Sequence, residues 1–381
     1  SSLNFTVLDS FRGICACIVA LSHFNANSII NGSALLDRGS PYVDFFFVLS
    51  GFIIFANYQD KLKQGTKIWE FIWLRWGRLY PLHFAVLLAF ILVDALQMMF
   101  DFGQSAAFAP FGAPGETPRA IFAMLFLVHS LGLTEILAFN GPSWSISVEF
   151  YAYILFAFII VYIRKHTELF IAFLSCACGL ALYFVAGELY AKLDYGFLRC
   201  VFGFGFGALT WSLYRLIAPT LEQKAKSWKF TSLLEALILL VTCIYIAYFS
   251  FNGLSFFAPL IFSIVILVFA IEGGLLSKML KMKAFVFIGM LSYSIYMVHL
   301  FISGKFFELP VRLLENSMGY SLTVQQGDMT LYGTNIIYGT LLEVFYLSFV
   351  ILCSFISYKA IEEPFRNLSK KVIKRKKKKV D

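Results

Sequence analysis

Stretches of about twenty apolar residues recur from one end of this chain to the other, and each is long enough to cross a bilayer as an α-helix. Of the 381 residues, 59% are hydrophobic and only 14% are charged, which excludes an ordinary soluble domain. The sequence therefore predicts an all-α, polytopic helical membrane protein. The first apolar stretch carries Arg12 and His23, and we expect it to be a retained helix rather than a signal peptide.

Eleven apolar segments can be drawn along the chain. They cover residues 6–30, 41–58, 76–99, 118–138, 144–163, 168–187, 196–216, 231–250, 254–272, 284–303 and 336–360. Basic residues gather after the second, fifth, seventh, ninth and last segments, and the positive-inside rule places those connections in the cytoplasm. If segments three, four and five all crossed, the connections after segments two and five would lie on opposite sides of the membrane. We therefore expect one of them, 118–138, to be re-entrant or interfacial.

The predicted topology is therefore about ten transmembrane helices plus one re-entrant or interfacial segment, with both termini cytoplasmic. Residues 1–365 form the membrane domain, and the connection 304–335 is expected to be a small, partly helical cap on the outer side. Residues 366–381 form a basic cytoplasmic tail. Residues 370–381 hold eight lysines and arginines and one aspartate, so they supply +7 of the net charge of +8. Because this tail follows a membrane helix, we expect it to meet anionic lipid headgroups rather than nucleic acid.

Some conspicuous residues predict packing rather than chemistry. The seven cysteines lie in apolar runs without a Cys-x-x-Cys pair, so neither a disulfide framework nor a metal site is expected. The glycines of 203–207 (Gly-Phe-Gly-Phe-Gly) lie within an apolar helix with no preceding strand, which indicates close helix packing rather than a dinucleotide site.

Four ionisable residues from different segments are expected at a similar depth in the outer half of the membrane: His23, Asp44, Glu149 and His299. A charged group within the membrane is costly and usually marks a site or a pathway. An imidazole titrates near neutral pH, so His23 is the strongest candidate for a general base. Glu149 could orient it, and Asp44 could pair with His23 or with a basic group, although each could also be structural.

Arginines are expected at the opposite depth. Arg75 and Arg78 are three residues apart and would share one face at the start of a helix, where free N–H groups also favour anions. Guanidinium groups suit phosphate. Together with Arg12, which lies eleven residues and roughly 16 Å before His23 on the same helix face, they predict a phosphate clamp.

These residues fall in an ordered set of motifs that resembles the acyltransferase-3 family of integral membrane acyltransferases. The matching pieces are Arg12-x10-His23, residues 43–52 (Val-Asp-Phe-Phe-Phe-Val-Leu-Ser-Gly-Phe), Arg75-x-x-Arg78 with Tyr80-Pro81, residues 144–149 (Trp-Ser-Ile-Ser-Val-Glu), residues 292–299 (Ser-Tyr-Ser-Ile-Tyr-Met-Val-His) and residues 362–366 (Glu-Glu-Pro-Phe-Arg). The likeness covers essentially the whole chain. Some members carry an esterase-like domain after the membrane part, and we expect none here.

The resemblance implies transfer of an acetyl or other short acyl group from acyl-CoA to a hydroxyl of a cell-surface glycan, a lipid-linked sugar or a similar acceptor. In that family the Arg-x10-His pair is regarded as essential and the Arg-x-x-Arg is linked to coenzyme A. We therefore expect His23, Glu149, Arg12 and Asp44 to be catalytic, and Arg12, Arg75, Arg78 and Tyr80 to bind the donor acyl-CoA. His299, Trp144 and Tyr296 would contact substrate. Donors for an oxyanion could be Ser145, Ser147, Tyr151 or an arginine.

The resemblance also suggests a bacterial inner membrane, with a homo-oligomer as one possibility. Direct transfer is the expected mechanism, and a two-step route through an acyl-enzyme is the second. The competing class is a proton-coupled transporter, since intramembrane His, Asp, Glu and Arg are what such a carrier would use. No internal repeat supports that reading.

Overall fold

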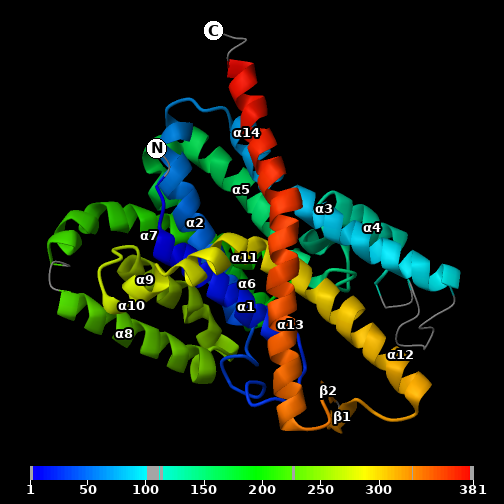
Figure 1. Cartoon of the computed structure of the whole chain (residues 1–381). Coiled ribbons are helices and arrows are strands. Elements are labelled where there is room, and N and C mark those ends of the chain that lie inside the picture. The colour runs from blue at the N-terminus through cyan, green and yellow to red at the C-terminus, as the bar shows by residue number, and fades with distance from the viewer. Residues whose placement is uncertain (1–2, 101–110, 112–114, 225–227, 328, 378–381) are drawn as a thin grey trace.

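The computed structural model describes residues 3–100, 111, 115–224, 228–327 and 329–377, and it is almost entirely helical (Figure 1). Among these residues, eight stretches are long and apolar enough to cross a membrane. One of them, Gly141–Ala186, contains two helices that separate at Arg164, whose φ is 46°. Counting those two separately, and adding the 17-residue helix α1, gives ten helices. The prediction of about ten transmembrane helices is confirmed.

The long helices agree with the predicted segments to within a few residues, except at some ends. They are α1 (Thr6–Ser22), α2 (Ser40–Lys63), α3 (Ile68–Phe100), α5 (Trp144–Ile163), α6 (Thr167–Ala186), α7 (Gly196–Lys224), α8 (Trp228–Ile244), α9 (Ala258–Phe269), α11 (Lys283–Phe301) and α13 (Ile336–Ser357). Short helices α10 (Leu275–Leu280), α12 (Leu309–Met318) and α14 (Glu363–Lys377) connect or extend them.

The segment 118–138 is broken, as the charge pattern predicts. Helix α4 (Pro118–Leu125) has eight residues, so it rises only about 12 Å and cannot cross a bilayer. A π-helical turn, His129–Leu133, follows it and contains non-helical backbone at Gly132. This backbone packs against α5, where buried protein surroundings can satisfy its polar groups.

Helices α1 and α11 run parallel and in register. A Cβ at Gly13 would lie 2.5 Å from the backbone nitrogen of Gly289, so only glycine allows the two backbones to approach this closely. Beyond that crossing the two helices stay in contact. Arg12 hydrogen-bonds Ser292, and ten residues beyond the glycines the rings of His23 and His299 are 5.1 Å apart.

Helices α2 and α7 make a second glycine crossing. A Cβ at Gly207 would lie 1.9 Å from the carbonyl oxygen of Val48, and one at Gly51 would lie 2.0 Å from that of Phe204. The expectation that the glycines of 203–207 serve helix packing is therefore confirmed for Gly207. This crossing holds α2, which lines the site, against the helix that carries Arg199.

The two ends of the chain lie at the same end of the molecule, and a small hairpin lies at the other (Figure 1). The hairpin pairs β1 (Thr323–Gln326) with β2 (Met329–Tyr332) in the predicted cap 304–335. The predicted tail begins as part of α14, where Ser369 and Ile373 are buried and Lys376 lies over the ring of Trp69 on α3. Residues 378–381 lie outside the described residues.

Candidate active site

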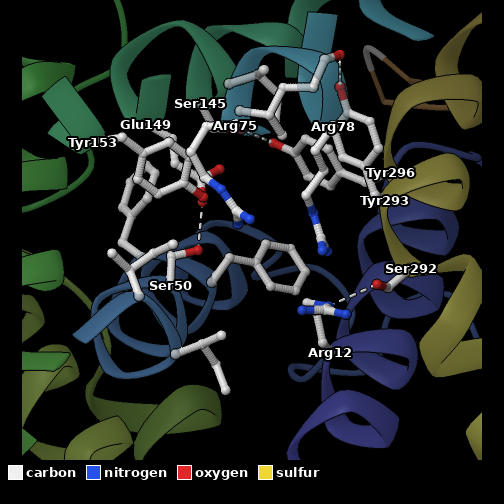
Figure 2. A pocket seen from close by; sticks show the side chains of 16 residues that line it. Arg12, Ser50, Arg75, Arg78, Ser145, Glu149, Tyr153, Ser292, Tyr293 and Tyr296 are labelled. Carbon is white, nitrogen blue, oxygen red and sulfur yellow. Dashed lines mark hydrogen bonds between the residues drawn. The ribbon is translucent and has the colours of Figure 1, made fainter. Parts of the chain in front are cut away.

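Three guanidinium groups converge on a cavity of about 690 Å³, its open mouth included (Figure 2). Arg12 comes from α1, while Arg75 and Arg78 come from neighbouring turns of α3. Helices α2, α5 and α11 supply the other walls. We call this the arginine cavity. Arg12 on α1 precedes Arg75 on α3 by 63 residues, and the structure thus brings together the three predicted arginines.

Two of these arginines keep hydrogen-bonding capacity for a ligand. Arg12 is held by Ser292 at 2.8 Å and by Asp9 at 2.9 Å, and Arg75 donates one bond to Tyr58 at 2.9 Å. The buried Nε of Arg75 has no partner, and Arg78 makes no hydrogen bond to any other residue that the structure describes. Guanidinium N–H groups that lack an acceptor in a protein interior are costly, and a polyanion such as a nucleotide phosphate would satisfy them.

Glu149 lies in the arginine cavity rather than beside His23. Its carboxylate accepts hydrogen bonds from Ser50, at 2.5 Å, and from Tyr153. The prediction that Glu149 shares a depth with His23 and could orient it has no support in this geometry. A carboxylate next to three cations lowers the net charge of the cavity, and this explains why it is placed here.

A second cavity, of about 1030 Å³ with its mouth, adjoins the first, and we call it the middle cavity. Trp144, Phe139 and Leu137 form apolar walls, while Asp37 and Lys192 are its charged groups. Tyr296 lines both the arginine cavity and the middle cavity. Of the predicted substrate-binding residues, Trp144 and Tyr296 thus meet at one chamber.

Tyr296 forms part of the partition between the two cavities. Its hydroxyl donates to the carbonyl oxygen of Pro142 at 3.0 Å and lies 2.8 Å from the hydroxyl of Ser145. Phe46 packs edge-on against its ring, with the ring centres 5.6 Å apart. Tyr296 is thus a side chain that the two spaces share.

His23 caps the C-terminal end of α1 and lines the middle cavity from the other side. Its Nδ1 is 2.8 Å from the carbonyl oxygen of Val19. Because a carbonyl only accepts, Nδ1 carries the proton, and the unprotonated Nε2 is left as an acceptor. This is the tautomer that a general base needs.

The ring of His299 lies against the ring of His23, and His299 is fully buried. Its Nδ1 is 3.2 Å from the carbonyl oxygen of Ile295, and its Nε2 has no partner within the described chain. His299 does not line the middle cavity, so the structure places it against the candidate base rather than in the open space expected for a substrate-binding residue.

Asp44 forms a buried ion pair with Arg199 and makes no bond to His23. Both of its oxygens accept bonds of 2.8 Å from Arg199 on α7. Arg199 also donates to the carbonyl oxygen of Ser40 and lies over the rings of Trp144 and Tyr190. Of the two partners predicted for Asp44, the structure shows the basic group.

Two details of the predicted donor site differ in the structure. Helix α3 begins at Ile68, so Arg75 and Arg78 lie in its second and third turns, where the N–H groups are already bonded within the helix. Tyr80 is two positions beyond Arg78, about 200° around the helix. It stacks with Trp76 and Phe84 on another face and does not line the arginine cavity.

Sequence reasoning missed several residues of the site. Arg199, Ser50, Tyr153 and Ser292 are ordinary members of apolar segments, although an arginine in the segment 196–216 already called for an acidic partner. The expected oxyanion donors Ser147 and Tyr151 are engaged with the carbonyl oxygens of Leu127 and Phe126.

The fold and the site define an integral membrane protein whose interior holds adjoining polar cavities, one of them lined by arginines. The model of an acyltransferase domain matches residues 5–359, which is nearly the whole chain. The chain therefore belongs to the acyltransferase-3 family of membrane acyltransferases.

Two curated proteins resemble parts of the chain. Acyltransferase MdmB of Streptomyces mycarofaciens is 32% identical over 157 residues, which is 40% of this chain and 37% of that protein. Protein 2 in picA locus of Rhizobium radiobacter is 30% identical over 165 residues, 38% of this chain and 77% of that protein. The chain thus spans little more than a third of the first relative's length. No solved structure matches the chain significantly.

Proposed function

We propose that this protein transfers an acetyl or other short acyl group from acyl-CoA to an acceptor hydroxyl, with His23 as general base. One observation carries the proposal: Tyr296 lines both the arginine cavity and the middle cavity, and His23 lines the far side of the middle cavity. The anion site and the candidate base therefore lie at the two ends of one row of spaces.

The arginine cavity suits the nucleotide end of the donor. Coenzyme A carries several phosphates, and the free groups of Arg75 and Arg78 offer the planar, charged donors that phosphate prefers. Arg12, already held by Asp9 and Ser292, supplies a third positive charge in a fixed place. The family membership favours this use of the arginines over a transport pathway.

The long flexible arm of the donor would pass Tyr296 to reach His23. Opening this passage breaks the bonds from Tyr296 to Pro142 and Ser145, each of which contributes about 1 kcal/mol net. Binding of the phosphates could offset that cost. The apolar walls at Trp144, Phe139 and Leu137 would then surround the acyl group.

The reaction balances without an acyl-enzyme. His23 Nε2 takes the proton of the acceptor hydroxyl, and the oxygen attacks the thioester carbonyl carbon. A C–O bond forms, the C–S bond breaks, and the imidazolium returns its proton to the leaving thiolate. Once Tyr296 has turned away from Pro142, its hydroxyl is free to donate to the oxyanion, whereas Ser145 already donates to the carbonyl oxygen of Pro142.

The proposed topology follows from the same row of spaces. Acyl-CoA is made in the cytoplasm, so the end of the molecule that carries both chain termini would face the cytoplasm (Figure 1). The hairpin end would face outward, and a bacterial inner membrane is the expected location. The basic residues of α14 would lie near anionic headgroups.

The test uses the protein in its own membranes, supplied with labelled acetyl-CoA. Wild-type protein should move the label to a cell-surface product, detected by mass spectrometry. Substitution His23→Gln should lower kcat by about 10²- to 10⁴-fold with little change in KM for acetyl-CoA. Substitution Arg78→Gln should mainly raise that KM, by about ten- to a hundredfold.

An exposed arginine provides the control for Arg78. Arg215 pairs at 3.6 Å with Asp60 outside the arginine cavity, so Arg215→Gln should leave both constants near wild type. If label never leaves coenzyme A in wild-type membranes, or if His23→Gln retains the wild-type rate, the proposal fails. Movement of a solute without thioester cleavage would favour a carrier instead.

A further inference from the structure

Lys192 is a charged residue of the middle cavity to which the proposed reaction gives no role. It lies in the loop between α6 and α7 and lines the cavity together with His23 and Trp144. Its side chain is exposed to the open space, and its ammonium makes no hydrogen bond or ion pair with any residue that the structure describes. Asp37, the other charged group of the cavity, forms no ion pair with it. A free cation therefore remains in the space that the candidate base lines.

The backbone on both sides of Lys192 is fixed by hydrogen bonds. The carbonyl oxygen of Ala191 accepts a bond from Nη1 of Arg199 at 3.3 Å. The carbonyl oxygen of Leu193 accepts a bond from the amide of Gly132 at 3.2 Å. The residues that flank Lys192 are thus joined to α7 and to the turn that follows α4, while the lysine side chain itself stays free.

The preceding part of the loop is anchored as well. The amide of Leu189 donates to the hydroxyl of Ser255 at 2.9 Å, and the hydroxyl of Tyr190 donates to the carbonyl oxygen of Ser250 at 2.6 Å. The guanidinium of Arg199 lies over the ring of Tyr190, 5.1 Å from its centre. The loop is therefore fixed from residue 189 to residue 193, and a charge that is already in place needs no rearrangement when the reaction begins.

The buried ion pair between Arg199 and Asp44 supports this arrangement. Nε and Nη2 of Arg199 bond the two oxygens of Asp44, and Nη1 is left to hold the carbonyl oxygen of Ala191. One guanidinium group thus joins α2 to α7 and also fixes the residue before Lys192. This second contact gives the ion pair a link to the middle cavity.

The proposed reaction develops negative charge in the middle cavity. When the acceptor oxygen adds to the thioester, the carbonyl oxygen becomes an oxyanion, and when the C–S bond breaks the charge passes to sulfur. A fixed cation stabilises both species, since opposite charges attract strongly where little water separates them. Tyr296 can donate to the oxyanion only after it leaves Pro142, whereas Lys192 has no bond to give up.

The same charge also acts on the imidazole of His23. Because Lys192 opposes the imidazolium that forms there, it can speed the reaction only if the oxyanion lies nearer to the ammonium than the imidazole does. His23 follows α1 and Lys192 precedes α7, so an acyl group in the middle cavity would meet the two side chains on different walls.

We infer that Lys192 is a further catalytic residue, whose ammonium stabilises the oxyanion and the leaving thiolate in the middle cavity. This inference rests on the proposed acyltransferase function and adds one group to its site. No bond forms to the lysine, and the proton still passes from the acceptor hydroxyl to His23 and from there to the thiolate, so the reaction balances as direct transfer does.

Substitution Lys192→Met tests the inference, because it removes the charge and keeps a side chain of similar length. In native membranes supplied with labelled acetyl-CoA, the variant should lower kcat by about 10²- to 10³-fold. The KM for acetyl-CoA should stay near the wild-type value, which also shows that the variant is folded. Glu188 lies in the same loop and does not line the middle cavity, so Glu188→Gln should leave both constants unchanged.

Chemical restoration of the charge separates catalysis from a structural effect. In a background where Cys176 is replaced by serine, Lys192→Cys is alkylated with 2-bromoethylamine, which rebuilds an ammonium at nearly the length of lysine. Mass spectrometry of the purified protein confirms the modification. The amine should raise kcat at least tenfold, whereas iodoacetamide, which adds a neutral amide to the same sulfur, should leave it low.

A wild-type kcat in Lys192→Met, or a raised KM with kcat unchanged, would overturn the inference. Equal recovery with the two reagents, or recovery with neither of them, would also overturn it. These outcomes are read against wild-type membranes that cleave acetyl-CoA. Absence of that cleavage in the wild type would instead contradict the proposed function itself.

Discussion

The fully buried guanidinium of Arg199 and the carboxylate of Asp44 depend on each other, because neither charge has water around it. A buried ion pair that loses one partner leaves an uncompensated charge in a medium of low dielectric constant. The ion pair supports the structural alternative for Asp44 rather than the catalytic role expected from the sequence.

Substitution Asp44→Asn therefore tests the structural role. It should lower the free energy of unfolding by about 3–5 kcal/mol, measured as a fall in the thermal midpoint of the purified protein. Asp60→Asn, which removes an exposed partner of Arg215, should change it by less than about 1 kcal/mol. A variant Asp44→Asn with the wild-type midpoint but no activity would show that Asp44 acts in catalysis.

The site residues differ in how far the sequence could place them. The sequence could single out Arg12, Arg75, Arg78 and His23, because a charged or titratable group in an apolar segment is costly and usually marks a site. Glu149 was expected near His23 but lines the arginine cavity, because a position along a segment predicts depth but not the direction in which the side chain points. The link from Asp44 to Arg199 spans 155 residues and needed the packing of α2 on α7.

At the scale of the helix, the crossing of α1 and α11 sets the site. The glycines Gly13 and Gly289 let the backbones touch, and the same pair of helices carries Arg12 with Ser292 and His23 with His299. Any separation at the glycines would therefore move both the arginine and the base.

Substitution Gly13→Ala should separate these helices, because the added Cβ would lie 2.5 Å from backbone atoms of α11 that cannot move aside alone. We expect a loss of about 1–3 kcal/mol in the free energy of unfolding and at least a tenfold loss of activity. Thermal unfolding and label transfer measure the two effects. Gly304→Ala is the control, since nothing lies within 4 Å of its Cβ. Equal behaviour of the two variants would contradict the role of the crossing.

Helix positions were predicted well because hydrophobicity over about twenty residues reports spanning length directly. Helix ends were predicted less well. The predicted segment 76–99 begins between Arg75 and Arg78, whereas α3 starts at Ile68, because an arginine that faces an internal cavity need not end an apolar helix. The first helix was extended to residue 30, whereas α1 ends at Ser22 and a loop carries the chain past His23.

At the scale of the whole molecule, the hairpin and the chain termini lie at opposite ends (Figure 1). The short, broken segment that contains α4 is what allows an even number of crossings between the termini. The predicted membrane topology can therefore be tested at two exposed positions, Gln325 on the hairpin and Lys374 on α14, which should lie on opposite sides of the membrane.

Single cysteines at these positions test the topology, in a background where the exposed Cys176 is replaced by serine. A membrane-impermeant maleimide should label Gln325→Cys in intact cells and Lys374→Cys only after the membrane is opened. Label on Lys374→Cys in intact cells would reverse the proposed orientation, and equal label on both would rule out termini and hairpin on opposite sides.

The in-register packing of α1 and α11 fixes the distance between Arg12 and His23. The eleven residues from Arg12 to His23 span roughly 16 Å of rigid helix, and the contact at Gly13 and Gly289 prevents the two helices from sliding past each other. In the proposed reaction, the span between the phosphates and the thioester carbonyl of acyl-CoA would then be set by the protein and not by the donor. A thioester on a truncated carrier would be bound yet stop short of the imidazole, so the enzyme would discriminate donors by reach.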